Sequence, residues 1–480
     1  MLDYTRIVSS LLFPLHERVK GHDTCTILRS LESSQWLAPD ALRAHQARML
    51  ANFIALVALS VPYYRTLFAR EGIDPAAFAA HDARDAMTLL ATLPLIDKSV
   101  IRANSTAFRA EGASDLIPQR TSGSSGEPLH FLLSRFRMSF DIAAKWRATR
   151  WWNVGIGDRE LVLWGSAIET GAQDRVRRLR DTLFRSRLVP THDLTPTRLA
   201  EILAEMRDWH PRMLFGYPSA LSRLAFHALE HGPRMDDLGI AVAFCTSEVL
   251  RPEWREAIGH GLGCGVANEY GARDAGFIAR ECPAGGLHIT AEEVIVEIVD
   301  ADGRRLPDGE EGEIVVTNLA GPGFPFLRYR TGDRGVLSTA TCACGRGLPL
   351  LERLSGRAND GLRRLDGGWV HGSAVNHMMR DLAGLRAYQI VQARPDSVSL
   401  RLELDGALPA AARDGMIAHL HHLLGEAVEV QVEQVVSIPP QPNGKFRHII
   451  CLVDEHAASN EECATPPMPT NAEHTEHHAE

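Results

Sequence analysis

Short apolar segments alternate with helical patterns between residues 160 and 272, and this alternation constrains the fold more than any other feature of the sequence. Apolar runs at 161–165, 213–216 and 240–244 have the length and composition of buried strands. Segments with helical periodicity lie between them, such as TRLAEILAEMRDW at 197–209, and a later helix has Pro252 in its first turn, where proline is favoured. The alternation indicates an α/β fold with a mainly parallel sheet covered by helices.

The pattern changes near residue 290, where EVIVEIVD and GEIVVTNL alternate apolar and polar residues as half-buried strands do. After Gly356 short strands and two helices follow, as expected for a small α+β domain. From Asp454 the chain has few apolar groups and cannot bury a core. We therefore predict a large N-terminal α/β domain with a β subdomain at 1–356, a small C-terminal α+β domain at 357–453 and a disordered tail at 454–480.

Composition excludes several classes of protein. The 480 residues include 51 Lys and Arg against 60 Asp and Glu, a net charge of −9, which argues against binding to a nucleic-acid backbone. No run approaches the roughly 18 apolar residues of a spanning helix, and the N-terminus lacks the pattern of a signal peptide. We therefore expect a cytoplasmic protein with no nucleic-acid or membrane partner, whose eight cysteines stay reduced.

A loop rich in glycine and serine follows the helical N-terminal region. Its hydroxyl groups and flexible backbone suit it to wrap phosphate oxygens. Its residues are Thr121, Ser122, Gly123, Ser124, Ser125, Gly126, Glu127 and Pro128. It is not a Walker loop, because no Gly-Lys-Ser/Thr follows, and by itself it is equally compatible with a solvated linker.

Four further clusters of polar residues follow in the chain. They are Asn268 to Asp274 after a predicted strand, Arg328 to Asp333, Gly356 to Asp360, and Gly444-Lys445 in the PPQPNGKFR loop. Each cluster alone is compatible with a turn, a surface ion pair, a helix cap or an exposed lysine. The order and spacing of the clusters along the chain are more specific than any single cluster.

Together with the loop at 121–128, these clusters resemble the motifs of the adenylate-forming (AMP-binding) enzyme superfamily over about residues 40–453. VPYYRTLF, FGYPSAL (215–221), CTSEVL (245–250) and CACGR (342–346) are similar to its phenylacetate–CoA ligase-like branch. The resemblance implies an active site between a large domain and a small mobile domain. It also implies that a carboxylate attacks the α-phosphate of ATP to form an acyl-adenylate, from which a thiol, usually that of coenzyme A, displaces AMP.

The resemblance implies roles for individual residues. Lys445 would bridge the attacking carboxylate and the α-phosphate, Asp333 would accept hydrogen bonds from the ribose hydroxyls, and Arg357 would contact ribose or phosphate. The triphosphate would lie on the 121–128 loop, and Mg²⁺ would be bound by Asp274. The residues expected beside the nucleotide base are Ser247, Glu248, Glu269, Tyr270 and Gly271.

The sequence departs from the family pattern at three places. Leu129 follows Pro128 where many relatives have lysine, and Arg273-Asp274 replaces the usual Thr-Glu, so that a shorter side chain would reach for Mg²⁺. The expected hinge is Asn359-Asp360 rather than Asp-Asp. The residues expected to face the nucleotide are all present.

Three cysteines and a histidine form a candidate metal site. Three thiolates and one imidazole are the ligand set of a closed tetrahedral zinc site, and here they are Cys282, His288, Cys342 and Cys344. Their spacing, Cys-x5-His and then Cys-x-Cys, is not that of a common zinc finger, and the alternative is four unrelated residues in two surface loops. We predict a structural Zn²⁺ and no catalytic metal there, because no coordination position would stay open.

The predicted function is ATP-dependent activation of an aromatic or other hydrophobic carboxylic acid, followed by thioester formation with coenzyme A. Two alternatives stay open: an adenylating ligase whose acceptor is an amine, a hydroxyl or a carrier-protein thiol in a biosynthetic pathway, and a nucleotide-binding protein that has lost catalysis. The presence of Lys445 argues against the second. Residues near Tyr217, 243–246 and 271–276 are expected to line the acid pocket, although the sequence does not identify the acid, and the resemblance suggests a homodimer.

Overall fold

The computed structural model describes residues 4–80, 82–121, 129–165, 175–191, 194–357, 361–366, 368–371, 378–379, 382–441 and 444–453. The chain divides into two compact units, of which the larger contains Met1–Asn359 and Ser437–Arg447, and the smaller contains Asp360–Val436 and His448–Glu480. The division lies close to the expected boundary after residue 356. The segment around Lys445 groups with the larger unit, whereas the sequence placed it in the small domain. The predicted tail and hinge lie outside the described residues.

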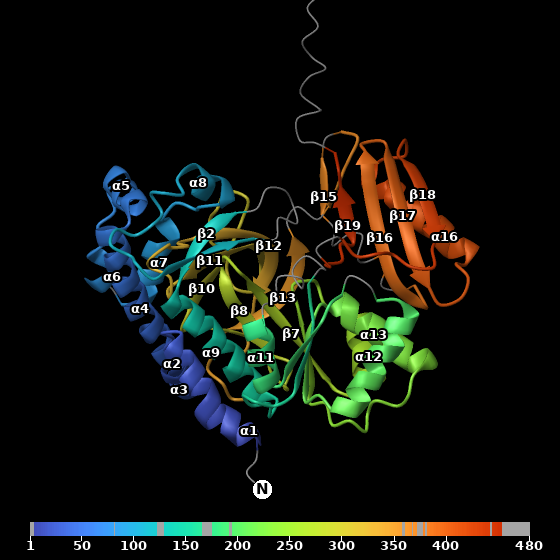
Figure 1. The fold of residues 1–480 in the computed structure, drawn as a ribbon. Coiled ribbons are helices and arrows are strands. Elements are labelled where there is room, and N and C mark those ends of the chain that lie inside the picture. The colour runs from blue at the N-terminus through green and yellow to red at the C-terminus, as the bar shows by residue number, and fades with distance from the viewer. Residues whose placement is uncertain are drawn as a thin grey trace, which may run out of the picture. The chain divides into compact units, whose positions relative to one another are not determined.

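The N-terminal part of the chain, up to Ala103, is helical (Figure 1). Its elements are α1 (Tyr4–Ile7), the π-helix η1 (Val8–Leu12), α2 (Phe13–Val19), α3 (Thr24–Ser34), α4 (Pro39–Ser60), α5 (Pro62–Glu71), α6 (Ala77–Ala80), α7 (Ala83–Thr92) and α8 (Lys98–Ala103). Side-chain caps fix the first turns of two of these helices. Asp82 accepts backbone N–H groups at the start of α7, and Asp97 does so at the start of α8. Helices α4 and α5 together span residues 39–71, with a break at Val61.

The larger unit is built on an 11-stranded sheet in the order β10-β11-β12-β13-β9-β8-β7-β6-β5-β3-β4. The strands are β3 (Glu160–Leu163), β4 (Ser186–Val189), β5 (Met213–Gly216), β6 (Val242–Thr246), β7 (Gly265–Ala272), β8 (Gly276–Glu281), β9 (Leu287–Ile289), β10 (Val294–Val299), β11 (Glu311–Asn318), β12 (Tyr329–Leu337) and β13 (Leu350–Arg357). Four neighbouring pairs are parallel: β4 with β3, β3 with β5, β5 with β6, and β6 with β7. The strand–helix alternation therefore produces the predicted α/β sheet.

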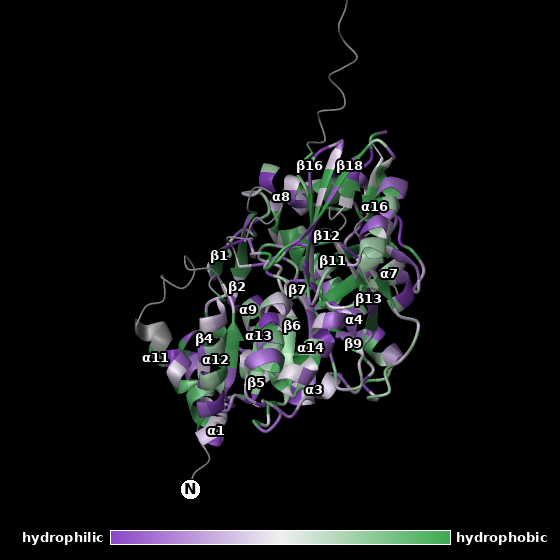
Figure 2. Cartoon of the chain, turned by 90° about the vertical axis from the view of Figure 1, so that its right-hand side faces the viewer, coloured by the Kyte–Doolittle hydropathy of each residue, from purple (hydrophilic) through white to green (hydrophobic). Residues whose placement is uncertain are grey.

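Helices connect these parallel strands. They are α11 (Arg175–Leu183), α12 (Pro196–Trp209), α13 (Pro218–His231) and α14 (Pro252–Leu262), while α9 (Arg135–Trp151) leads from β2 into β3. Strands β5 and β6 are mostly apolar, and β6 is buried along its whole length (Figure 2). A continuous apolar strand is typical of a parallel sheet covered on both faces.

The predicted β region extends the same sheet and does not form a separate one. β7 and β8 pair as an antiparallel hairpin, and every following pair out to β10 is also antiparallel. A separate antiparallel hairpin of β1 (Leu116–Arg120) and β2 (His130–Ser134) flanks the glycine- and serine-rich loop.

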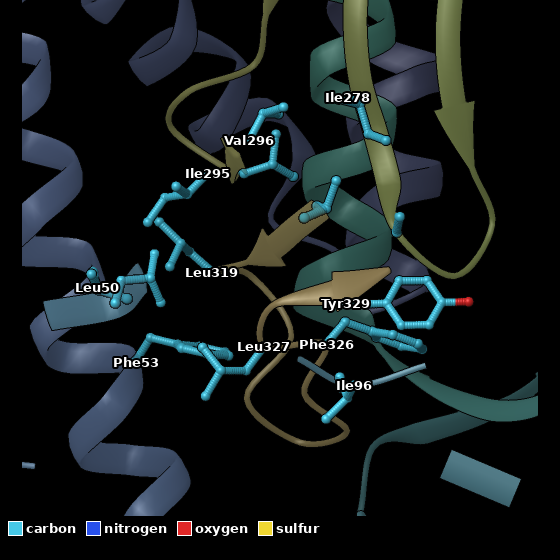
Figure 3. Packing of buried hydrophobic residues seen from close by; sticks show 14 of the residues in the cluster. Leu50, Phe53, Ile96, Ile278, Ile295, Val296, Leu319, Phe326, Leu327 and Tyr329 are labelled. Carbon is cyan, nitrogen blue, oxygen red and sulfur yellow. The ribbon is translucent and has the colours of Figure 1, made fainter. Parts of the chain in front are cut away.

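The largest core lies where the N-terminal helices meet the antiparallel strands. Leu50 and Phe53 of α4 point toward Leu319, which directly follows β11, and Leu327, which lies shortly before β12 (Figure 3). All four side chains are buried. This core supports the strand that carries Tyr329 and Asp333.

The smaller unit contains a four-stranded sheet in the order β18-β17-β16-β19. Its elements are β14 (Gly361–Arg363), β15 (Trp369–His371), β16 (Leu385–Arg394), β17 (Ser397–Leu404), α16 (Ala410–Leu424), β18 (Glu429–Gln434) and β19 (Ile449–Cys451). The expected α+β composition and the helix near 409–424 are confirmed. The segment SAVNHMMRDL (373–382), which also has a helical pattern, lies mostly outside the described residues.

No single helix within the described ranges is long and apolar enough to cross a membrane. Helices α4 and α5 meet the length and hydropathy requirement only when taken together, and they are bent by 103° at their junction.

Candidate active site

The candidate site residues of the α/β part gather at the carboxyl ends of the parallel strands. The order of the strands reverses at β3, whose neighbours are β4 and β5. Open α/β sheets bind ligands outside the carboxyl ends of their strands at such a point. Gly165 follows β3, Tyr217 follows β5, and Ser247 and Glu248 follow β6.

Two tyrosine–aspartate hydrogen bonds connect β7 with β12. The Tyr270 hydroxyl donates to Asp333 Oδ2 over 3.0 Å, and the Tyr329 hydroxyl donates to Asp274 Oδ2 over 2.7 Å. Burial, and next the adjacent carboxylate, raise the pKa of each hydroxyl well above its usual value, so each tyrosine donates as a neutral phenol. The two motifs therefore share one hydrogen-bonded site, with Asp333 oriented by Tyr270.

Thr331 completes the support of Asp333. Its hydroxyl donates to the carbonyl of Ile314 over 2.8 Å and accepts the backbone N–H of Asp333 over 3.1 Å. In the antiparallel pair of β12 and β13, Asp333 is the register partner of Arg357. The sheet register thus makes neighbours of the residue expected to bind the ribose and the residue expected to contact ribose or phosphate, although they stand in different motifs.

The backbone of the turn after β7 accepts hydrogen bonds from two side chains that the sequence did not single out. Arg137 of α9 donates to the carbonyl of Asp274 over 3.0 Å, and Asn318 donates to the carbonyl of Ala275 over 3.1 Å. Asp274 is 4% exposed, and its Oδ1 accepts the N–H of Ala275. Asp274 therefore supports the turn, in addition to its predicted role toward Mg²⁺.

Arg137 is fully buried among acidic groups. Its Nε lies 3.4 Å from Glu293 Oε1 and 3.7 Å from Asp141 Oδ2. Burial raises the pKa of both carboxyl groups, and repulsion by the carboxylate of Asp141 raises the pKa of Glu293 further. No local pattern marks these residues, because they come from distant parts of the chain.

The described ends of the glycine- and serine-rich loop follow β1 and precede β2. Thr121 Oγ1 accepts the N–H of Leu129 over 2.9 Å and closes the base of the loop. Arg273 donates to the carbonyl of Arg120 over 3.0 Å, which ties the loop base to the turn after β7. The predicted phosphate-binding residues Ser122 to Gly126 lie outside the described residues.

Glu269 is positioned differently from the other predicted base-binding residues. Its Oε2 accepts from Arg280 Nε over 2.7 Å, and both side chains are 3% exposed. A buried charge of this kind needs its partner, so the ion pair joins β7 to β8. Gly271 lies next to a register shift of the same hairpin, and a β-carbon there would be only 2.8 Å from the carbonyl of Gly276.

Glu248 contacts the part of the larger unit that carries Lys445, Ser437–Arg447, which we call the Lys445 segment. Glu248 Oε1 accepts the N–H of Phe446, and its Oε2 accepts the N–H of Ser219 over 3.1 Å. Burial raises the pKa of Glu248 to about 7, against the opposing effects of these hydrogen bonds and of Lys445. Lys445 therefore lies on the larger unit, near the carboxyl ends of its parallel strands.

Two aromatic rings lie beside the same ends of the strands. Trp164 and Tyr217 stack with their ring centroids 4.4 Å apart and their planes at 26°. Tyr217 is 2% exposed, whereas Trp164 is partly exposed. The two stacked rings lie where the sequence predicted Tyr217 to line the acid pocket, with Trp164 as the ring that is partly exposed.

The predicted metal ligands converge. The ligand atoms of Cys282, His288, Cys342 and Cys344 all lie within 4.8 Å of one another. Cys282 Sγ is 3.6 Å from Cys342 Sγ, and Cys344 Sγ is 3.2 Å from His288 Nε2. Zinc–sulfur bonds of about 2.3 Å and zinc–nitrogen bonds of about 2.0 Å would place tetrahedral ligands about 3.5–3.8 Å apart. Burial lowers the pKa of His288 to about 4, which keeps its imidazole neutral as a ligand must be.

Parts of the chain are similar in sequence to known proteins. Residues 362–451 match the family model of the CapK C-terminal domain. The phenylacetate–coenzyme A ligase of Thermus thermophilus is 25% identical over 338 residues, covering 68% of this chain and 72% of that protein. The enzyme of the same name from Pseudomonas putida is 26% identical over 342 residues, covering 69% and 74%.

A solved structure has the same fold. It is 2-hydroxyisobutyryl-CoA ligase in the postadenylation state, with a TM-score of 0.68 and 20% identity over 85% of this chain and 88% of that chain. At this identity the likeness concerns the fold.

Proposed function

We propose that the chain is an adenylate-forming enzyme of the phenylacetate–CoA ligase-like branch, to whose curated members it is similar in sequence. It activates a carboxylic acid with ATP and transfers the acyl group to coenzyme A. The observation that carries this proposal is the shared site of the Tyr270–Asp333 and Tyr329–Asp274 pairs, with the Lys445 segment bound to the same unit.

In the first half-reaction the substrate carboxylate attacks the α-phosphate of ATP, and pyrophosphate leaves. Asp333 is an acceptor for the ribose hydroxyls, and Tyr270 fixes the direction of its carboxylate. The ammonium group of Lys445 stabilises the negative charge that builds on the α-phosphate. In the second half-reaction the thiol of coenzyme A attacks the acyl carbonyl, and AMP leaves.

Mg²⁺ would neutralise phosphate charge, and Asp274 is the candidate protein ligand. A carboxylate offers about four acceptor positions, and two of them are used by Tyr329 and Ala275. The chemistry fits a cation that prefers oxygen ligands, although only the free positions of a nearly buried group remain. Titration of activity with Mg²⁺ for Asp274→Asn separates the two roles: a ligand role raises the Mg²⁺ requirement, and a purely supporting role lowers thermal stability alone.

The acid is proposed to be aromatic or otherwise hydrophobic. Trp164 is partly exposed and is backed by the buried ring of Tyr217, so that it offers an apolar ring against which an aromatic acid can stack. The test is pyrophosphate release over a panel of aromatic and aliphatic acids, with and without coenzyme A. Release that depends on an aromatic acid, together with loss of free thiol, supports the proposal. Release with amide or ester formation instead would identify another acceptor, and no release with any acid would contradict the activity.

We propose a structural zinc ion at the Cys–His cluster. Two ligands come from the β8–β9 region, and two come from the connection between β12 and β13. An ion would therefore join these two parts of the chain. All four positions would be filled by protein, which leaves none for catalysis. Elemental analysis of protein truncated before His474 should give about one zinc per chain, and less than a tenth of an equivalent would contradict the site.

Three further expectations accompany the proposal. Residues 360–436 and 448–453 form a domain that moves between the half-reactions, the protein is a homodimer, and it is cytoplasmic. Small-angle scattering with and without an acyl-adenylate analogue tests the movement, sedimentation tests the dimer, and cell fractionation tests the location.

A further inference from the structure

The Lys445 segment is attached to the larger unit at both of its ends. At its start, the guanidinium group of Arg223 donates to Ser437 Oγ. At its end, the ring of Phe446 packs edge-on against Trp254, with the centroids 6.0 Å apart. Trp254 is 2% exposed and belongs to α14. These contacts hold the segment on the larger unit independently of the strands that flank it in the smaller unit.

Gly444 fits closely against the ends of the parallel strands. Its φ is +79°, a conformation that favours glycine. A β-carbon on Gly444 would lie 2.8 Å from Thr191 Oγ1 and 3.0 Å from the carbonyl of Gly165. The residue before Lys445 is thus in close contact with the residues that follow β3 and β4.

Glu248 links this segment to the start of α13. The N-cap residue of α13, Tyr217, makes no side-chain capping bond, and Glu248 instead accepts the N–H of Ser219 from outside the helix. A carboxylate is favourable at a helix N-terminus, where N–H groups lack partners within the helix. The other oxygen of the same carboxylate accepts the N–H of Phe446, the residue after Lys445.

We propose that Glu248 is a positioning residue that latches the Lys445 segment onto the larger unit for the first half-reaction. The proposal rests on the proposed function, and it replaces the role beside the nucleotide base that the sequence suggested for Glu248. Both carboxylate oxygens are engaged by backbone N–H groups, and the carboxylate holds the lysine through the adjacent peptide group. When Lys445 leaves for the second half-reaction, the bond from Phe446 breaks, and the bond from Ser219 keeps Glu248 in place.

The test compares Glu248→Ala with the matched control Glu256→Gln. Glu256 is an acid on the neighbouring helix α14, and its side chain is 74% exposed. Loss of a hydrogen bond to a charged group predicts that Glu248→Ala forms acyl-adenylate about 10- to 100-fold more slowly. Its ATP affinity and its conversion of supplied acyl-adenylate with coenzyme A should match those of the wild type. The control should behave as the wild type in all three measurements.

Hydrogen exchange of the Phe446 amide gives a readout that needs no substrate. In Glu248→Ala this amide should exchange about tenfold faster or more, because it loses its acceptor. Gly444→Ala, which cannot keep the close contact, should have the same effect by a second route. Unchanged exchange in both variants, or equal loss of both half-reactions in Glu248→Ala, would overturn the latch. Faster exchange in a protein that activates no acid would leave the latch standing and refute the proposed function.

Discussion

Arg328 and Arg330 stand two residues apart in the motif that contains Asp333, and the structure gives them opposite environments. The side chain of Arg328 is 2% exposed, and its Nε donates to Glu297 Oε2 over 3.0 Å. Arg328 Nη1 also donates to the carbonyls of Ala91 and Leu93, which attach the end of α7 to the sheet. The side chain of Arg330 is 36% exposed and pairs with Glu313. Replacing each arginine by methionine should therefore have very different effects.

Arg328→Met leaves the buried carboxylate of Glu297 and two carbonyl groups without their donor. Breaking a buried ion pair in this way costs about 3–5 kcal/mol, whereas an exposed pair such as that of Arg330 is worth about 0–1 kcal/mol. At about 2 °C per kcal/mol for a large domain, Arg328→Met should lower Tm by about 6–10 °C and Arg330→Met by at most about 2 °C.

Thermal unfolding followed by circular dichroism measures both shifts in Tm. ATP titration of the same samples measures whether either substitution also changes the affinity for ATP. Asp333→Asn should unfold near the wild-type temperature but bind ATP more than about tenfold more weakly, because a neutral amide is a poorer acceptor for the ribose hydroxyls. Equal Tm values for the two arginine variants would refute the structural role of Arg328. Weaker ATP binding in Arg328→Met without any loss of stability would place this arginine in the site.

Three other substitutions follow from the site. Lys445→Ala should abolish acyl-adenylate formation and leave ATP binding and the conversion of supplied acyl-adenylate intact; wild-type pyrophosphate exchange would exclude its catalytic role. Tyr270→Phe removes the donor to Asp333 Oδ2 and should weaken ATP binding by about tenfold. Tyr63→Phe on α5 is the control and should bind ATP as the wild type does. The same ATP affinity in Tyr270→Phe and in the wild type would show that Tyr270 is not needed to orient Asp333. Cys344→Ser should lower zinc content and Tm together, and a change in Tm without a change in metal content would contradict the zinc site.

Local patterns predicted the elements that periodicity can report. The helices α12 and α14, the strands β5 and β7 and the pair β10 and β11 were expected from the spacing of apolar residues and are present. Proline at the first turn of α14 is also confirmed. The period of a segment depends on which of its faces is buried, and that is a property of neighbouring residues. Which strands become neighbours does not follow from it, and so the continuation of the sheet through β8 was not expected.

The sequence by itself also determined which residue types stand in the candidate site, because the motifs of Asp333 and Lys445 are contiguous. Only the tertiary structure decided how these residues are used. It paired Tyr270 with Asp333 and Tyr329 with Asp274, and it turned Glu248 toward Phe446. These contacts join residues that are 55 to 198 positions apart. A hydrogen bond depends on the final distance and direction of two groups, and for residues so far apart these are set by the packing of the whole sheet.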